Sequence, residues 1–155
     1  LPAGKSFPAP LRLCRTALGA LLIRGFNAFA RGAAWVGCKR SRMSAELRRA
    51  YSAPYNSWAN RIATLRFVED IPPAPGDKAY PIVAETQEKL HSLAALPMLV
   101  CWGLKDFVFD RHFLAEWTRR FPGAEIHSFP DCGHYILEDA QNEVVPLIKR
   151  FIQNA

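Results

Sequence analysis

The sequence predicts an α/β fold with a parallel sheet, preceded by a helical segment. After residue 81, strand-like and helix-like patterns alternate along the chain. The run PMLVCWG at 97–103 is almost continuously apolar, which is typical of a strand buried on both faces of a parallel sheet. A strand–helix–strand–helix order favours right-handed crossovers between parallel strands.

The first half of the chain lacks this alternation. Residues 10–38 carry small and apolar side chains on a repeating face, so we expect helix there, weakened by Gly19, Gly25 and Gly32. Residues 44–68 predict two short helices broken at Pro54, with Ser44 as the N-cap of the first. The proline-rich stretch 69–81 predicts a loop or linker.

The elements expected after this linker continue to the end of the chain. They are a helix at about 82–94, the strand at 97–103, a helix at 110–121, a short strand at 124–130 and a helix at about 138–153. Pro146 lies inside the last of these. Because proline lacks a backbone donor, it predicts a kink there or a split into two helices.

Composition and charge restrict the classes of function. Half of the 155 residues are apolar and 22% are charged, as in a globular domain. The apolar run at 17–23 is shorter than the roughly 20 residues of a membrane span. Residues 1–43 hold eight Lys or Arg and no acid, which fits a folded helical segment, a targeting segment, a nucleic-acid arm or a lipid-facing surface. A folded segment is the favoured interpretation because large apolar side chains, which could pack in a core, lie among these basic residues.

The four cysteines are widely spaced and form no C-x-x-C pair. Structural zinc sites need clustered ligands, so we expect no metal site, and nothing in the sequence calls for a cofactor. Reduced thiols favour a cytoplasmic protein.

Two strands of the predicted sheet end in polar, turn-forming residues. Gly-Leu-Lys-Asp follows the first strand at 103–106, and Pro-Asp-Cys-Gly-His follows the second at 130–134. The carboxyl ends of neighbouring parallel strands meet at one edge, so Asp106 and His134 should lie together. A carboxylate that accepts a hydrogen bond from an imidazole leaves the other ring nitrogen available as a base. Singly, such residues are more often turn formers or structural histidines; together they predict the acid and base of a catalytic triad.

These motifs carry a resemblance to a known family. LPMLVCWGLKDFVFD at 96–110, FPDCGHYILEDA at 129–140 and the terminal helix resemble the C-terminal part of the α/β-hydrolase fold. NAFARGA at 27–33 and APYNSWANRIATLRFVEDIP at 53–72 narrow the resemblance further. They are similar to the branch that holds haloalkane dehalogenases, epoxide hydrolases and the β-lactone decarboxylases of bacterial olefin synthesis.

The resemblance implies a division of the chain and a role for each site residue. Residues 1–75 would be a helical cap segment, and 76–155 the C-terminal portion of the hydrolase core. Asp106 would be the triad acid and His134 the base, although some relatives place the acid after an earlier strand. The substrate would be a small apolar haloalkane, epoxide or β-lactone. Aromatic residues that could line its pocket, if they are not ordinary core residues, are Tyr55, Trp58, Phe67, Phe107 and Phe109.

The sequence departs from the family in one respect. Family members carry the nucleophile on a G-x-S-x-G-like or G-x-D-x-G-like turn between a strand and a helix, and no such motif occurs here. We therefore expect a C-terminal fragment whose nucleophile, an Asp by the resemblance, belongs to the missing N-terminal half of the core. The strand at 97–103 would then lack a neighbour on one side, which predicts instability or self-association of the isolated chain.

A non-catalytic interpretation remains open. The chain could be a pseudoenzyme or an interaction fragment whose basic N-terminal surface binds an acidic partner. Other olefin-pathway enzymes are possible partners under the resemblance. Nucleic acid is the least favoured partner, because the bases in 1–43 alternate with Leu, Ala and Gly without a known binding motif.

Overall fold

The computed structural model describes residues 7–154, which divide into two compact units. The first unit is formed by residues 7–35 and 43–89, and the second by Val36–Arg42 and residues 90–154. Val36–Arg42, hereafter the 36–42 segment, therefore belongs to the second unit although both of its chain neighbours belong to the first.

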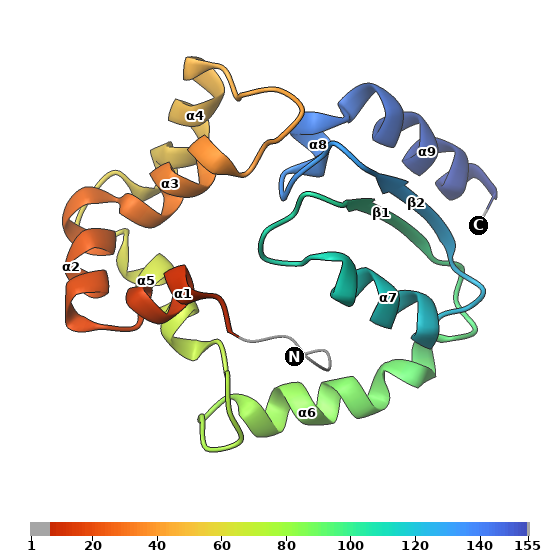
Figure 1. Cartoon of the computed structure of the whole chain (residues 1–155), viewed down its shortest axis with the longest axis horizontal. Coiled ribbons are helices and arrows are strands. Elements are labelled where there is room, and N and C mark those ends of the chain that lie inside the picture. The colour runs from red at the N-terminus through yellow and green to blue at the C-terminus, as the bar shows by residue number, and fades with distance from the viewer. Residues whose placement is uncertain (1–6, 155) are drawn as a thin grey trace. The chain divides into compact units, whose positions relative to one another are not determined.

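The first unit is helical, as predicted. Its helices in chain order are α1 (Ala9–Cys14), α2 (Ala17–Phe26), α3 (Ala28–Val36), α4 (Ala45–Ser52), the 3-10 helix η1 (Ala53–Tyr55), α5 (Ile62–Asp70) and α6 (Tyr80–Lys89) (Figure 1). The predicted helical stretch at 10–38 is thus three helices. Thr16 caps α2 by accepting a hydrogen bond from the Gly19 amide at 3.1 Å. Asn27 ends α2 in the left-handed conformation, with φ of 54°.

The second helical stretch also breaks where the sequence predicts it. The Ser44 hydroxyl accepts a hydrogen bond from the Leu47 amide at 3.1 Å and caps α4. α4 ends at Ser52, and Pro54 lies in η1. The proline-rich loop that follows is anchored by Arg15, whose guanidinium contacts the Asp77 carboxylate at 2.8 Å.

The second unit contains the sheet. Its elements are the 3-10 helix η2 (Leu90–Leu93), β1 (Leu99–Gly103), α7 (Arg111–Arg120), β2 (Glu125–Phe129), α8 (Ile136–Asp139) and α9 (Gln141–Asn154). β1 and β2 are parallel, in the register that pairs Leu99 with Glu125 and Gly103 with Phe129. Figure 1 shows the two strands between α7 and α9. The α/β prediction with parallel strands is confirmed.

A buried cluster joins β2 to the C-terminal helices. It consists of Phe129, Cys132, Ala140 and Val144, and partly buried Cys101, Ile136, Leu147 and Ile148 pack against it. Burial of this apolar surface is the main contribution to holding α8 and α9 on the sheet.

The structure contradicts one of the two outcomes predicted for Pro146. α9 runs through Pro146 without a break, and the helical stretch is divided at Ala140 instead, so a split at Pro146 is wrong. Pro146 removes one backbone hydrogen bond. The neighbouring Val144, Leu147 and Ile148 pack into the core, and this burial outweighs the lost bond.

Across residues 7–154, the helices are all too short or too polar to cross a membrane.

Candidate active site

The site begins where the two strands end side by side. Gly103 and Phe129 are paired at the carboxyl ends of β1 and β2, and the chain beyond each strand stays in contact with the other. The Leu104 amide donates to the Phe129 carbonyl at 3.0 Å, and the Lys105 amide donates to the Cys132 carbonyl at 2.9 Å. These bonds hold the turn after β1 against residues 130–135, hereafter the His134 loop.

Gly103 permits this close approach. A Cβ atom at this position would lie 2.3 Å from the Gly133 carbonyl oxygen and 2.7 Å from that of Cys132. Both contacts are with backbone, so neither could move away without displacing the His134 loop. The absence of a side chain at Gly103 is therefore required for the two turns to meet.

Asp106 lies in the turn after β1, where both of its carboxylate oxygens are engaged. One oxygen accepts hydrogen bonds from the amides of Val108 at 2.7 Å and Phe109 at 3.0 Å. The other lies 2.8 Å from Nδ1 of His134. The Asp106 side chain is only 9% exposed. The backbone amides fix its orientation, so it presents one oxygen to the imidazole.

This arrangement shifts both pKa values. Burial raises the pKa of the Asp106 carboxyl, but the hydrogen bonds from His134, Phe109 and Val108 outweigh burial and hold it below its ordinary value. The hydrogen bond to Asp106 raises the pKa of the His134 imidazole, against the opposing effect of burial. Both shifts favour a negative Asp106 beside an imidazole that carries its proton on Nδ1.

His134 is held by its backbone as well as by its ring. Its amide donates to the Gly37 carbonyl at 2.8 Å. Its ring lies among Phe107, Phe109 and Tyr135, with centroid separations of 6.3, 5.7 and 5.5 Å. The side chain is 31% exposed, and Nε2 makes no hydrogen bond with any residue in 7–154. With Nδ1 directed to Asp106, Nε2 is the nitrogen that could exchange a proton with a reacting group.

The neighbouring thiols are poor nucleophiles. Burial raises the pKa of Cys132, in the His134 loop, to about 11. Burial does the same to Cys38, whose pKa is also raised to about 11. A thiol must lose its proton to attack carbon, so both cysteines are suited to packing rather than to catalysis.

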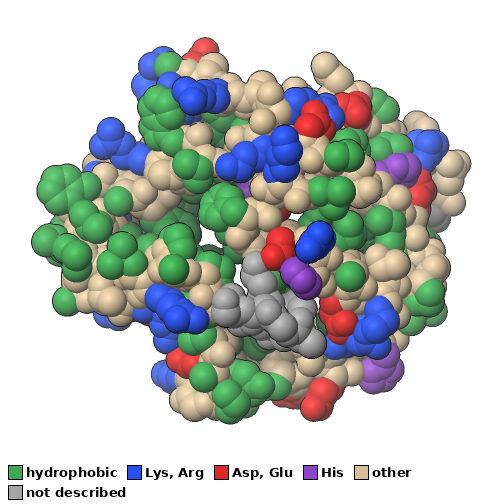
Figure 2. All heavy atoms as spheres, viewed as in Figure 1, with side chains coloured by type: hydrophobic (Ala, Val, Ile, Leu, Met, Phe, Trp, Pro, Cys, Tyr) green, Lys and Arg blue, Asp and Glu red, His purple; other side chains and the backbone are tan. Residues whose placement is uncertain are grey.

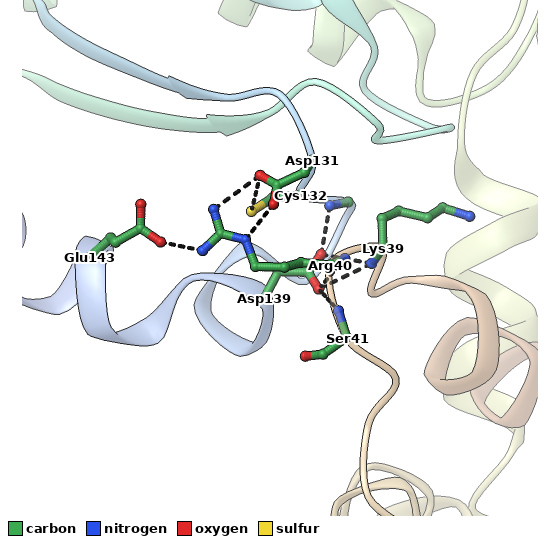
Figure 3. A network of polar contacts seen from close by, with 8 residues as sticks. Lys39, Arg40, Ser41, Asp131, Cys132, Asp139 and Glu143 are labelled. Atoms are coloured by element: carbon green, nitrogen blue, oxygen red, sulfur yellow. Dashed lines mark hydrogen bonds and ion pairs between the residues drawn. The ribbon is translucent and has the colours of Figure 1, made fainter.

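Sequence reasoning missed a buried carboxylate next to this site. Asp139, at the end of α8, is 6% exposed and accepts hydrogen bonds from backbone amides of the 36–42 segment and of the His134 loop (Figure 3). In the same segment, the Arg40 guanidinium pairs with both oxygens of Asp131 at 2.7 and 3.0 Å and with Glu143. No local sequence signal marks Asp139, because its partners are backbone amides and those of Lys39 and Arg40 lie about 100 positions earlier.

The predicted aromatic residues divide between the two units. Phe107 and Phe109 lie beside His134, as given above. Tyr55, Trp58 and Phe67 belong to the first unit. There the Trp58 ring stacks with the Arg24 guanidinium at 4.3 Å, and Phe67 is 67% exposed on α5. That these three residues line a substrate pocket stays a prediction.

A cavity of about 410 Å³ lies within the first unit, between α3 and α4. Arg31, Arg48, Arg49 and Trp35 are among its lining residues, and none of the five predicted aromatic residues lines it. It is therefore not the apolar pocket that the sequence predicts. Among residues 7–154, no group of three or more His, Cys, Asp or Glu side chains is placed to hold a metal ion.

Comparisons with known proteins agree with the fold. The family model described as the alpha/beta hydrolase fold matches residues 22–141. A cis-3-alkyl-4-alkyloxetan-2-one decarboxylase of Shewanella oneidensis is 56% identical over 153 residues, which is 98% of this chain and 48% of that protein. A protein of the same name from Xanthomonas campestris is 46% identical, over 99% of this chain and 51% of its own length. This chain spans about half the length of these curated relatives.

Solved structures show the same fold. The haloalkane dehalogenase DbeA from Bradyrhizobium elkani superimposes with a TM-score of 0.74 and 24% identity, over 94% of this chain and 51% of its own. The haloalkane dehalogenase DatA from Agrobacterium tumefaciens superimposes with a TM-score of 0.77 and 17% identity, over 96% of this chain and 52% of its own. At these identities the likeness is one of fold. With the family model covering most of its length, the chain belongs to the alpha/beta hydrolase fold family.

Proposed function

We propose that Asp106 and His134 are the acid and the base of a hydrolase triad, whose nucleophile lies outside these 155 residues. The observation that carries this proposal is the 2.8 Å contact between Asp106 and Nδ1 of His134, with the second Asp106 oxygen fixed by two backbone amides. An acid oriented by its own backbone holds the imidazole in one tautomer, which is what a triad requires.

The division of the chain follows the same proposal. Residues 1–75 would be a helical cap segment, of which 1–6 lie outside the described residues, and 76–155 would be the C-terminal portion of the core. In the whole protein, an apolar substrate would bind beside His134. Phe107 and Phe109 would form the wall of that pocket nearest the imidazole.

The proposed substrate is a β-lactone of the cis-3-alkyl-4-alkyloxetan-2-one type. Two relatives that carry this substrate in their name are 56% and 46% identical to the chain. Loss of CO₂ from an oxetan-2-one breaks the C4–O bond and the C2–C3 bond and leaves a C3=C4 double bond. The reaction consumes neither water nor a proton.

A carboxylate nucleophile can perform this reaction in two balanced steps. Attack on C4 breaks the ring C–O bond and forms an ester and a free carboxylate. Cleavage of C2–C3 then releases CO₂, the electron pair forms the alkene, and the enzyme carboxylate leaves. A protonated His134 could stabilise the carboxylate that forms on ring opening. A neutral His134 would instead activate water and hydrolyse the ester to a 3-hydroxy acid.

A chimera tests the proposal without any assumption about the ends of the chain. This sequence would replace the matching residues of the Shewanella relative, and the chimera would be supplied with a cis-3,4-dialkyl-oxetan-2-one. We expect alkene and CO₂ in equal amounts. A 3-hydroxy acid would support the triad but not the decarboxylation. No turnover, by a folded chimera whose parent is active, would support the non-catalytic alternative.

A haloalkane substrate provides the matched comparison. The dehalogenases share the fold at 24% identity or less, so they do not favour dehalogenation for this chain. Halide release that exceeds lactone turnover in the same chimera would overturn the proposed substrate class.

A further inference from the structure

Asp139 is a buried carboxylate whose hydrogen-bond partners come from two separate parts of the second unit. Its first oxygen accepts from the amides of Lys39 and Arg40, each at 3.0 Å. Its second oxygen accepts from the amides of Lys39 at 2.8 Å and Gly133 at 2.6 Å. One carboxylate therefore joins the 36–42 segment to the residue immediately before His134 (Figure 3).

The 36–42 segment contacts His134 directly. The Gly37 carbonyl accepts hydrogen bonds from the amides of His134 at 2.8 Å and Tyr135 at 3.4 Å. A Cβ atom on Gly133 would lie 2.3 Å from the same Gly37 oxygen, so the two backbones are in close contact. Any shift of the 36–42 segment would therefore move the acceptor of the His134 amide.

We propose that Asp139 is the positioning residue for His134, acting through the 36–42 segment and Gly133. The inference rests on the proposed function of His134, because a triad base must hold its imidazole ring in one position. Amide hydrogen bonds to a buried carboxylate are charge-assisted and strongly directional. Losing the charge would leave amide donors of both chain segments without a satisfactory acceptor.

The side-chain ion pairs of the 36–42 segment cannot substitute for Asp139. Arg40 pairs with Asp131 and Glu143, whose side chains are 49% and 52% exposed. Ion pairs at this exposure are screened by solvent and contribute little to stability. Asp131→Asn therefore gives a matched control: it removes a carboxylate from the same network and the same loop, without touching the amides that Asp139 holds.

The experiment is a nuclear magnetic resonance titration of the His134 ring in the full chain and in its Asp139→Asn variant. Asparagine would direct an NH₂ group at amide donors, which should release the 36–42 segment. We expect the His134 pKa to fall toward the ordinary imidazole value of about 6.5 and the hydrogen-bonded Nδ1–H signal to be lost. Asp131→Asn should leave both unchanged. A folded Asp139→Asn variant with an unchanged His134 titration and Nδ1–H signal would overturn the inference.

A second measurement decides the matter if Asp139→Asn does not fold. In the unsubstituted chain, the amides of Lys39, Arg40, Gly133 and His134 should exchange with solvent slowly and at similar rates, as one cooperative unit. Rapid exchange of Gly133 and His134 while β2 stays protected would overturn the inference.

These readouts do not depend on turnover, so the two proposals can fail separately. If His134→Gln left the chimera active while Asp139→Asn still shifted the ring titration, the proposed function would fail and the positioning would stand. If His134→Gln abolished turnover while Asp139→Asn left the ring titration unchanged, only the positioning role would be rejected.

Discussion

Nδ1 of His134 lies 2.8 Å from a carboxylate oxygen of Asp106, and the other oxygen of Asp106 accepts two backbone amides from the turn that follows it. The amides of Val108 and Phe109 thus orient the Asp106 carboxylate, and Asp106 in turn orients the His134 imidazole. Each group is oriented by the next, and the last one is fixed by the chain itself.

Replacement of Asp106 by Asn should lower the pKa of His134 toward about 6.5, because the imidazolium loses its negative partner. The substitution should also reduce the free energy of unfolding by about 1–3 kcal/mol, since two backbone amides lose a charged acceptor. Ring titration by nuclear magnetic resonance and denaturant unfolding measure the two effects. An unchanged ring pKa in the folded variant would show that the contact does not control His134.

The pair of Asp106 and His134 also makes the free energy of unfolding depend on pH. Asp106 gives a loss of stability at low pH, hereafter the acid limb, and His134 gives a loss at high pH, hereafter the alkaline limb. The pKa of Asp106 is lowered by folding, so its contribution is present above its unfolded value of about 3.9 and is lost as the pH falls through the folded value. The pKa of His134 is raised, so its contribution is present below its unfolded value of about 6.5 and is lost as the pH rises through the folded value.

The stability difference between the native chain and Asp106→Asn should therefore be largest between about pH 4 and 6.5. Denaturant unfolding across pH 3–9 measures it. Asp131→Asn is the control: its carboxyl has a lowered pKa through the hydrogen bond to Arg40, which stays charged, so it should show the acid limb alone. A difference for Asp106→Asn that stays constant through neutral pH would contradict the assignment of the alkaline limb to His134.

Gly103→Ala should destabilise the second unit by about 1–3 kcal/mol, because the added Cβ would meet two carbonyl oxygens of the His134 loop. Gly123→Ala is the matched control, since a Cβ there has no atom within 4 Å. Denaturant unfolding of the two variants should separate them clearly. Equal stabilities would mean that the turns after β1 and β2 are not tightly packed in solution.

The isolated chain should self-associate. Within residues 7–154, β1 pairs with β2 on one side and with no strand on the other. Large hydrophobic side chains are exposed as well, and Figure 2 shows several gathered over α2. Light scattering after size-exclusion chromatography should detect species larger than 17.4 kDa. A chain that elutes and scatters light as a monomer would prove the expectation wrong.

Much of this site was predictable from short-range patterns. The apolar run ending at Gly103 and the Gly-His pair at 133–134 mark two strand ends, and parallel strands bring their carboxyl ends together. The Ser44 cap and the break at Pro54 were predictable for the same local reasons. The catalytic roles of Asp106 and His134 and the substrate-binding role of the aromatic residues remain proposals.

Long-range backbone contacts were not predictable. Asp139 is unremarkable within the stretch ILED at 136–139, and its partners are amides at 39, 40 and 133. The 36–42 segment likewise belongs to the second unit through tertiary contacts rather than through its local sequence. Pro146 shows the converse: a strong local signal for a helix break is overridden by the packing of Val144 and its neighbours.

The most direct test of the acid–base pair compares two histidines in the decarboxylase chimera. His112 also contacts an aspartate, Asp110, at 3.1 Å, but its side chain is 48% exposed on α7. His134→Gln should reduce alkene formation at least about 100-fold, the lower end of what the loss of one group that stabilises a developing anion costs, while His112→Gln should leave the rate unchanged. Equal rates in the two variants, with both proteins folded, would contradict a catalytic His134.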